Sequence, residues 1–370
     1  MLDAIPAAKG FARFQVTGKV RESASITSLV LEPAADTGRV EFRPGQFIVV
    51  RIPQAEGAQL LRAYSLSSDP DDPARLRISV KHELPPANAP DLPAGLGSSF
   101  LHEQVEVGGQ LEVAGPSGSF VLDESSERPV LLFSGGVGLT PMVSMLHRLA
   151  TRSTRAVYFI HACENGEVHA LREEVLALAA RRAGIHVHFC YRTPTREDLH
   201  NGHHHSSGLV SRHTLQALLP LDDYDAYLCG PRPFMQANWR LLRGLGIDKA
   251  RICFEFFGPA TLLDEDKDET PAAPRVPAPQ ADAQLTVRFE PGGQALAWDD
   301  ACPSLLDCAE RAGLTPPFSC RAGLCNACLS PLLSGTVEYR EPPLMMPGPG
   351  QVLLCCARPT SAVVVALENS

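Results

Sequence analysis

The spacing of hydrophobic and polar positions changes twice along the chain, and its first stretch consists of short apolar runs. From about Phe11 to Leu122 these runs are separated by Pro, Gly and Asp. They read ITSLVLEP, FIVVRIP, LRISVKHE and QLEVAGP. Short β-type runs with turn residues between them favour a small antiparallel barrel or sandwich.

The second stretch, from about Pro129 to Pro259, alternates buried strands with helices. Continuous apolar runs predict strands that are covered on both faces, and these runs are PVLLFSGG, AVYFIHA, GIHVHFCY and AYLCGP. Helices are predicted for MVSMLHRLA, ALREEVLALAARR and PFMQANWRLLRGLG. This order of elements predicts a parallel α/β domain that binds a nucleotide.

The third stretch follows a segment that cannot build a core. From Asp264 to Ala283 an acidic run gives way to alternating Pro and Ala, which is typical of a semi-rigid spacer. Beyond it, LTVRFE, GTVEY, QVLLC and AVVVALE predict strands, and PSLLDCAERAG predicts an amphipathic helix that ends at Gly. We therefore expect domains at residues 11–125, 126–260 and 284–370, with a linker at 261–283.

Composition narrows the possible functions. The chain has 370 residues, 44% of them hydrophobic and 20% charged, as expected for folded domains. Its net charge of −9 argues against a nucleic-acid-binding surface. We expect no membrane span, because no apolar run reaches about 18 residues. Without a secretory pattern at the N-terminus, the 11 cysteines predict cytoplasmic thiols and a metal site.

The strongest chemical signal is a cluster of cysteines in SCRAGLCNACL. Cys320, Cys325 and Cys328 have the C-x4-C-x2-C spacing of a plant-type [2Fe–2S] centre, which needs a fourth, distant thiolate. That ligand is Cys355 or Cys356 in VLLCCARP, and strand alternation would let only one of them point inward. A zinc site is the alternative, although structural zinc usually has paired C-x2-C knuckles.

At these residues, the last 90 or so positions resemble plant-type ferredoxins, which have a β-grasp fold. In that family the fourth cysteine is followed by x-A-R-P, so the resemblance implies that Cys355 is the ligand. The adjoining Cys356 departs from common usage in the family.

Two further motifs suit a flavin and a dinucleotide. RPGQF is followed by RAYSLSS, in which Arg62 offers charge for phosphate, Tyr64 a ring for stacking and Ser65 a donor for the isoalloxazine edge. SGGVGLTP, Ser134 to Pro141, ends a predicted strand and opens a helix. Its glycines would let the backbone approach a pyrophosphate at the helix N-terminus.

RPGQF, RAYSLSS, SGGVGLTP and CGP, in this order, resemble the ferredoxin–NADP reductase superfamily and especially the reductase part of flavohaemoglobins. The resemblance implies an FAD-binding antiparallel β-barrel, an NAD(P)-binding parallel α/β domain and an α+β ferredoxin domain. It implies catalytic roles for Tyr64, Ser65, Cys229 and Glu255. It implies cofactor contacts from Arg62, Ala63, Tyr64, Ser65, Lys81, Gly97, Ser98, Gly135, Gly136, Gly138, Thr140, Pro141, Glu164, Cys229, Gly230, Pro231 and Glu255.

The domain order resembles the reductase components of ring-hydroxylating and demethylating oxygenases, and the hybrid-cluster-protein reductases. The implied activity is hydride transfer from NAD(P)H to FAD, then delivery of single electrons through the cluster to a separate oxygenase. The segment from Asp282 to Ser370 has nine acidic and five basic residues, which suggests transient docking to a basic patch. The alternatives are a terminal quinone or ferric reductase, the reductase of a hybrid-cluster protein, and a zinc-stabilised binding module.

The sequence also favours NADH over NADPH. Glu164 follows the predicted strand YFIHA, where a carboxylate can accept from a free ribose hydroxyl and would repel a 2′-phosphate. Glu167 could do the same or face solvent. Arg152, Arg155 or Arg192 could instead reach the site and favour NADPH.

Overall fold

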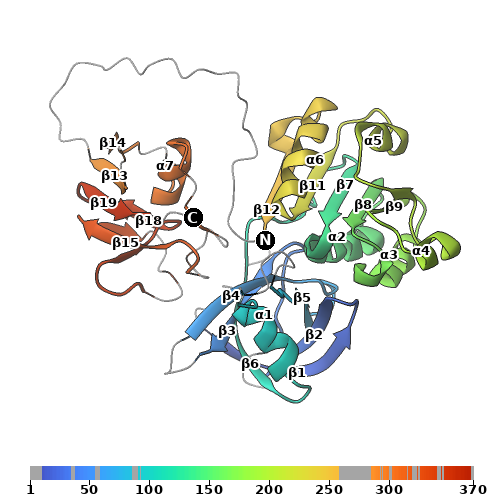
Figure 1. Ribbon diagram of the computed structural model, residues 1–370, viewed down its shortest axis with the longest axis horizontal. Coiled ribbons are helices and arrows are strands. Elements are labelled where there is room, and N and C mark those ends of the chain that lie inside the picture. Colours follow the sequence, from blue (N-terminus) through green and yellow to red (C-terminus); the bar gives the residue numbers. More distant parts are fainter. Residues whose placement is uncertain are drawn as a thin grey trace. The chain divides into compact units, whose positions relative to one another are not determined.

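The computed structural model describes residues 11–34, 38–54, 59–85, 91, 93–257, 285–291, 293, 295–299, 302–314, 316–318, 323, 326–339, 343 and 346–367. The chain divides into two compact units, Met1–Phe257 and Gly258–Ser370 (Figure 1). The linker proposed at 261–283 lies outside the described residues, as do Cys320 and Cys325.

The first half of the larger unit is an antiparallel β domain. Its strands are β1 (Ala12–Arg21), β2 (Ile26–Pro33), β3 (Phe47–Pro53), β4 (Gln59–Ser65), β5 (Leu76–Lys81) and β6 (Gln110–Ser117). They form one sheet in the order β4-β3-β6-β1-β2-β5. An antiparallel bridge between Leu66 and Ile78 joins the two edges, so the sheet curls into a barrel.

A short helical segment packs against this barrel. Helix α1 (Leu96–Ser99) continues into a π-helical turn, Phe100–Gln104. Leu101 and Val105 are buried in the same apolar cluster as the inward-facing residues of the strands. The segment is therefore anchored by its second half, while its first residues face β4.

The second half of the larger unit is a parallel α/β domain. Its strands are β7 (Val130–Gly135), β8 (Val157–Cys163), β9 (Ile185–Tyr191), β10 (Ser206–Ser207), β11 (Asp225–Gly230) and β12 (Ile252–Phe256). Its helices are α2 (Leu139–Arg152), α3 (Arg172–Ala179), α4 (Arg196–Asn201), α5 (Arg212–Leu218) and α6 (Arg232–Gly244). The sheet order is β10-β9-β8-β7-β11-β12. The chain order reverses beside β7, so α2 and α3 cover one face and α5 and α6 the other (Figure 1).

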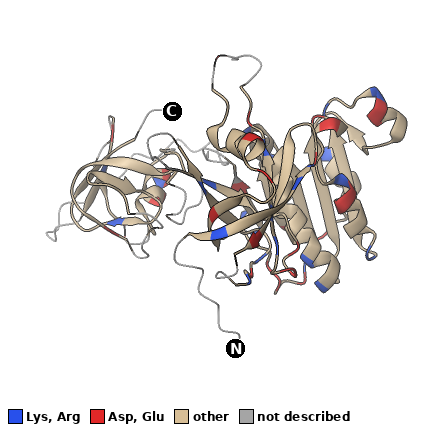
Figure 2. Cartoon of the chain, turned by 90° about the horizontal axis from the view of Figure 1, so that it is seen from below, with Lys and Arg blue, Asp and Glu red and all other residues tan. Residues whose placement is uncertain are grey.

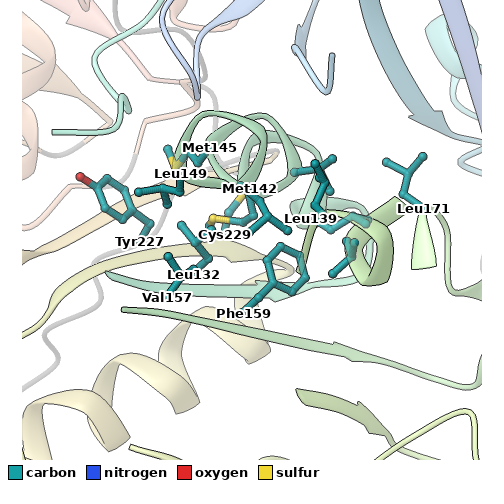
Figure 3. Close-up of a cluster of buried hydrophobic side chains, with 14 of the residues drawn as sticks. Leu132, Leu139, Met142, Met145, Leu149, Val157, Phe159, Leu171, Tyr227 and Cys229 are labelled. Carbon is teal, nitrogen blue, oxygen red and sulfur yellow. The ribbon is translucent and has the colours of Figure 1, made fainter. Parts of the chain in front are cut away.

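The core of this domain lies between α2 and the sheet (Figure 3). Met142 of α2 packs among Leu132 of β7, Phe159 of β8 and Cys229 of β11, and all four side chains are at most 1% exposed. Every residue of β7 is buried, which is why the sequence there is apolar without alternation.

The segment that joins the two domains is held from both sides. After β6, the Leu122 N–H donates to the carbonyl of Pro44 at 3.1 Å. The Asp123 N–H donates to the hydroxyl of Tyr227, a residue of β11, at 2.8 Å. Because Tyr227 is only 1% exposed, this hydrogen bond fixes the entry into the α/β domain away from water.

The smaller unit has short strands and one helix among its described residues. Its elements are β13 (Thr286–Glu290), β14 (Leu296–Ala297), α7 (Leu305–Arg311), β15 (Leu329–Ser334), β16 (Val337–Tyr339), β17 (Gln351–Leu353), β18 (Ala357–Pro359) and β19 (Val363–Ala366). One sheet runs β14-β13-β19-β15-β17, with β13 and β19 parallel, and β16 pairs with β18. The apolar residues of α7 join these strands in a common core.

The predicted fold classes are confirmed, but one local expectation is wrong. QVLLC was expected to be a strand in which neighbouring side chains alternate, whereas β17 ends at Leu353 and residues 354–356 form a turn. The Cys356 N–H donates back to the Leu353 carbonyl at 3.4 Å. A turn does not send successive side chains to opposite faces, so the alternation argument for choosing between Cys355 and Cys356 fails.

Acidic and basic positions are interspersed over the described elements of each unit, without an extended stripe of Lys and Arg (Figure 2). None of the described helices combines the length and the apolar character that a membrane span requires.

Tyr227→Phe should lower the free energy of unfolding by about 1–2 kcal/mol, because the Asp123 N–H would lose an acceptor that lies on a buried side chain. Tyr224→Phe is the matched control. The Tyr224 hydroxyl donates to the carbonyl of the exposed Pro220, where water can replace it, so the loss should be smaller. Denaturant unfolding of both variants measures the difference, and equal losses would contradict the role of Tyr227.

Candidate functional site

The RAYS motif lies at the end of β4, beside the start of α1. Arg62 and Tyr64 are two residues apart on this strand and therefore project from the same face. Gly97 packs directly under them, because a Cβ atom there would lie 2.9 Å from Cγ of Arg62 and 3.2 Å from the Tyr64 hydroxyl oxygen. The fold thus brings together a cation, an aromatic ring and a glycine that were predicted from two separate motifs.

Ser98 and Lys81, also predicted to contact the cofactor, have partners within the protein. The Ser98 hydroxyl donates to the Gly95 carbonyl at 2.9 Å and accepts from the Glu83 N–H at 3.1 Å. The Lys81 ammonium pairs with the Glu83 carboxylate at 3.1 Å. The Ser98 contacts hold the start of α1 against the residues after β5, whereas the Lys81 pair is local to that strand end. Phosphate contacts by these two residues remain predictions.

Ser65 and Glu255 meet where the β domain and the α/β domain face each other. Ser65 is buried, and its hydroxyl donates to Oε2 of Glu255 at 3.4 Å. Glu255 belongs to β12, at the carboxyl edge of the parallel sheet. Burial raises the pKa of Glu255 to about 8, against a smaller lowering effect of the Ser65 hydrogen bond. This carboxyl group can therefore hold a proton near neutral pH.

Cys229 is next to Glu255 in the sheet but faces the core. The two residues are register partners on β11 and β12. The thiol of Cys229 is fully buried beside Met142 and Leu132 (Figure 3), and burial raises its pKa well above the usual range. The structure therefore keeps this side chain protonated and away from solvent, and its catalytic role stays a prediction.

The SGGVGLTP motif forms the predicted junction between β7 and α2. Its glycines form a 3₁₀ turn, Gly136–Gly138, and Gly136 has a φ of +54° with open space where a side chain would stand. A Cβ atom at Gly138 would lie 2.3 Å from the Cys229 carbonyl oxygen, so only glycine fits there. No side chain caps the N-terminus of α2, and its first turn carries no acidic residue.

The other residues of this junction are structural or exposed. Thr140 is buried, and its hydroxyl donates to the Val137 carbonyl at 3.2 Å. Gly135 and Gly230 face each other across β7 and β11, and Pro231 is the exposed N-cap of α6. Phe234 was not predicted. Its ring would lie 2.8 Å from a Cβ atom at Gly135 and 2.6 Å from one at Gly230.

Phe234 follows the CGP motif by three residues, which places it in the first turn of α6. An apolar residue at that spacing was the only signal in the sequence, and any amphipathic helix would supply it. Its ring packs directly beneath both strand ends. The uncapped helix of 14 residues and the open space at Gly136 fit a dinucleotide pyrophosphate. The exposed Arg62 guanidinium and the neighbouring Tyr64 ring fit a flavin.

Glu164 is exposed at the carboxyl end of β8, as expected for a residue near an adenosine ribose. Its backbone carbonyl accepts from the Thr193 N–H at 2.8 Å, and its carboxylate lies 4.0 Å from the Arg192 guanidinium. Arg152 and Arg155 lie beyond the other end of the strand, where they pair with Asp71 and Asp225. Of the three arginines considered from sequence, Arg192 is therefore the one beside Glu164.

In the smaller unit, two of the four predicted cluster ligands lie together. Cys328 and Cys355 are buried, and the Cys355 N–H points to the Cys328 sulfur at 3.4 Å. The Gly323 N–H points to the Cys355 sulfur at 3.3 Å. Backbone N–H groups aimed at sulfur atoms are what a thiolate-ligated cluster requires. Cys320 and Cys325 lie outside the described residues, so their placement is not described.

Cys356 lies at the same loop. Gly323 has a φ of +67°, and a Cβ atom there would lie 2.9 Å from the Cys356 sulfur. The N–H donated by Gly323 nevertheless goes to Cys355, which is also the more buried of the two. This favours Cys355, as the ferredoxin resemblance implied, although the assignment stays a prediction.

Comparison with known families matches all three folded parts of the chain. Residues 13–122 match the oxidoreductase FAD-binding domain, and residues 132–239 match the oxidoreductase NAD-binding domain. Residues 288–360 match the 2Fe-2S iron–sulfur cluster binding domain, which favours a cluster over the zinc alternative.

Similar proteins cover either part or all of the chain. The flavohemoprotein of Bordetella pertussis is 43% identical over 251 residues, 67% of this chain and 61% of that protein. This chain thus spans about three fifths of the curated relatives it matches. The FAD/NAD-binding domain of the nitric oxide dioxygenase from Vibrio cholerae is 38% identical, with 67% of this chain and 99% of that one covered and a TM-score of 0.59.

Phthalate dioxygenase reductase shares the whole architecture, with 97% of this chain and 98% of that one covered. Its identity is 23% and its TM-score 0.56, so this likeness concerns the fold. Together, the matched domains and the Vibrio cholerae relative show that the chain is an iron–sulfur flavoprotein oxidoreductase of the ferredoxin–NADP reductase superfamily, with flavohaemoglobin-like FAD and NAD domains and a 2Fe–2S domain.

Proposed function

We propose that this protein is the reductase component of an oxygenase system. It takes a hydride from NADH onto FAD and passes single electrons through a [2Fe–2S] cluster to a separate oxygenase, which it meets by transient docking. The observation that carries this proposal is the presence, in one chain, of the Ser65–Glu255 site and the Cys328–Cys355 sulfur site. A terminal reductase of small molecules would need only the first of them.

The fused architecture supports the same conclusion. Phthalate dioxygenase reductase, whose fold matches nearly the full chain, is a modular structure for electron transfer from pyridine nucleotides to [2Fe–2S]. That likeness concerns the fold alone, so the oxygenase partner is inferred from domain content and not from sequence identity. The described part of the 2Fe–2S unit offers buried sulfurs close to a loop, as an electron-transfer module requires.

Each predicted residue has a distinct task in this function. FAD, when bound, supplies a two-electron acceptor that can release electrons singly. Arg62 and Tyr64 would hold it, the first by charge on phosphate and the second by stacking. Ser65 and Glu255 would orient its reactive edge, and the raised pKa of Glu255 lets this residue donate a hydrogen bond as a neutral acid. The glycine turn and the N-terminus of α2 would bind the pyrophosphate of the nucleotide.

Turnover with two kinds of acceptor tests the proposed function. The purified chain should show flavin and cluster absorption, and NADH should drive reduction of both menadione and cytochrome c. Cys355→Ser should lose most cytochrome c reduction, which needs single electrons from the cluster, and keep menadione reduction at the flavin. Full cytochrome c reduction without an intact cluster would instead identify a terminal small-molecule reductase.

Glu164→Gln should raise the catalytic efficiency with NADPH by about tenfold, or ~1.4 kcal/mol, while changing that with NADH less. The reason is that the exposed carboxylate beside Arg192 would no longer repel a 2′-phosphate. Glu167→Gln, three residues on and also exposed, tests the alternative that this second carboxylate faces the ribose, and it should leave the ratio unchanged if Glu164 alone does so. Steady-state kinetics at low salt provide the two efficiencies. A native chain that prefers NADPH would point to Arg192 as the determinant.

Glu255 should contribute stability that is lost as the pH rises from about 4.5 to 8, so Glu255→Gln should change the pH dependence of stability over this range. The folded protein raises the pKa of Glu255 from 4.5 to about 8, so between these values the folded state binds more protons than the unfolded state. The contribution is therefore complete below about pH 4.5 and is lost as the pH passes 8. Thermal unfolding at several pH values measures it, with Glu167→Gln as an exposed control. Identical slopes in both variants would argue against a protonated Glu255.

Cys355→Ser should bleach or destabilise the cluster, and Cys356→Ser should leave its absorption and electron paramagnetic resonance signal intact. The Gly323 N–H is directed at the Cys355 sulfur, which is the arrangement expected of a ligand. Iron and sulfide content per chain, measured beside the spectra, separates cluster loss from a changed spectrum. The reverse pattern would show that Cys356 is the ligand.

A further inference from the structure

A cluster of charged side chains joins the β domain to the α/β domain at a distance from the cofactor motifs. The guanidinium of Arg77, on β5, binds both carboxylate oxygens of Glu174, on α3, at 2.7 and 2.8 Å. His147, on α2, places Nε2 at 2.6 Å from the same carboxylate and Nδ1 at 3.6 Å from Asp69 of the β domain. Two residues from each domain therefore interlock.

The β-domain side of this cluster is tied to the flavin motif. Besides Glu174, the Arg77 guanidinium donates to the backbone carbonyl and to the hydroxyl of Ser67. Ser67 is fully buried and lies two residues after Ser65, the residue that contacts Glu255. Any shift of Arg77 would therefore be passed to the segment that carries RAYS.

The α/β side is tied to the nucleotide motif. His147 sits in the middle of α2, the helix that begins directly after the glycine turn, and Glu174 sits on α3, which packs beside α2. Both helices cover the same face of the sheet (Figure 1). The cluster thus connects the rigid supports of the flavin segment and of the nucleotide turn.

The ion pair between Arg77 and Glu174 is partly buried, and both of its groups stay charged at neutral pH. The side chains of Arg77 and Glu174 are 18% and 25% exposed, so water screens them only in part. Burial alone would raise the pKa of Glu174, but the hydrogen bonds from His147 and Arg77 outweigh it and lower the pKa to about 2. A two-pronged arginine–carboxylate pair also fixes the relative orientation of its partners, which a single contact does not.

We propose that Arg77 and Glu174 are positioning residues for hydride transfer: they set how the β-barrel and the parallel sheet are oriented, and thereby the approach of the nicotinamide to the flavin. This rests on the proposed reduction of FAD by NADH. Neither residue belongs to the motifs predicted to contact a cofactor. Their influence would pass through Ser67 on one side and through α2 and α3 on the other.

Hydride transfer is sensitive to this kind of support. Reacting atoms must approach to about 3–3.5 Å, and a misplacement of about 1 Å can lower the rate by roughly a hundredfold. A pair that orients two domains can therefore change the rate of the chemical step without touching the substrate. It would leave nucleotide affinity almost unchanged, because the binding residues keep their places within each domain.

The test is single-turnover reduction of the flavin by NADH under anaerobic conditions in the full chain. Glu174→Gln and Arg77→Gln should each slow flavin reduction by on the order of tenfold, with flavin content and the dissociation constant of NADH little changed. Arg77→Lys, which keeps the charge but not the fork, should fall between them and the native chain. The double variant should be slowed by clearly less than the product of the two single effects, because both substitutions remove the contact between Arg77 and Glu174.

Two matched controls separate positioning from general loss of charge. Arg75→Gln removes an arginine of the same segment whose partner, Glu32, lies within the β domain, and Glu173→Gln removes the exposed neighbour of Glu174 on α3. Both should reduce flavin at the native rate. NADH deuterated at the transferred position should give a larger isotope effect in the Glu174 variant, because hydride transfer becomes more rate-limiting.

The possible results separate the two levels of the proposal. A lower melting temperature with a reduction rate within twofold of the native chain would overturn the positioning role and leave a purely stabilising contact. Additive slowing in the double variant would also overturn it. Failure of NADH to reduce the flavin of the unsubstituted chain would instead overturn the proposed function itself.

Discussion

Hydride transfer between a nicotinamide and a flavin requires atoms about 3–3.5 Å apart, and each ring belongs to a different domain. The seam between the β-barrel and the parallel sheet is therefore the constraint on which the rest of the larger unit depends. At this seam the hydroxyl of Ser65 reaches the carboxylate of Glu255, 190 residues away in sequence, at 3.4 Å. The segment that connects the two domains is fixed by the hydrogen bond to Tyr227. The domains are therefore held together both at the Ser65–Glu255 contact and at the connecting segment.

The sequence alone was sufficient to predict those features of the larger unit that depend on residues close together in the chain. The apolar runs predicted β7, β8, β9 and β11, and the glycine turn followed from its motif. Burial on both faces was wrong for the first half of β9, where residues 185–188 are exposed or only partly buried. The contact of Arg77 with Glu174 was not predictable, since these residues are 97 positions apart and each looks like an ordinary surface charge. Phe234 was missed for a similar reason. The prediction that QVLLC is a strand was wrong at its end, because it assumed strand geometry up to the last apolar residue, whereas residues 354–356 form a turn.

The 2Fe–2S unit places different demands on the chain. Its sulfur site is held by backbone N–H groups from loops and turns, at Gly323 and Cys355, and less by regular strands. Such a site needs glycine where the backbone is left-handed, and Gly323 meets that requirement. Single-electron transfer tolerates longer and more variable distances than hydride transfer. It is therefore reasonable that this unit is a separate compact body, whereas the flavin and nucleotide domains share one.

The ion pair of Arg77 and Glu174 between the two domains follows from the precision that hydride transfer requires. Apolar contacts also join the two domains, but by themselves they would allow sliding and rotation, because hydrophobic attraction has no direction. The two hydrogen bonds from the Arg77 guanidinium to the Glu174 carboxylate fix both the distance and the angle between these groups. Their formation costs free energy, because both charges are partly removed from water. Ser67 and His147 offset that cost by hydrogen bonds to the same two groups. A geometry that must be held to a fraction of an ångström is thus supported by a directional interaction, beside the apolar contacts that Ile26, Phe120 and Leu122 make with the core of the α/β domain.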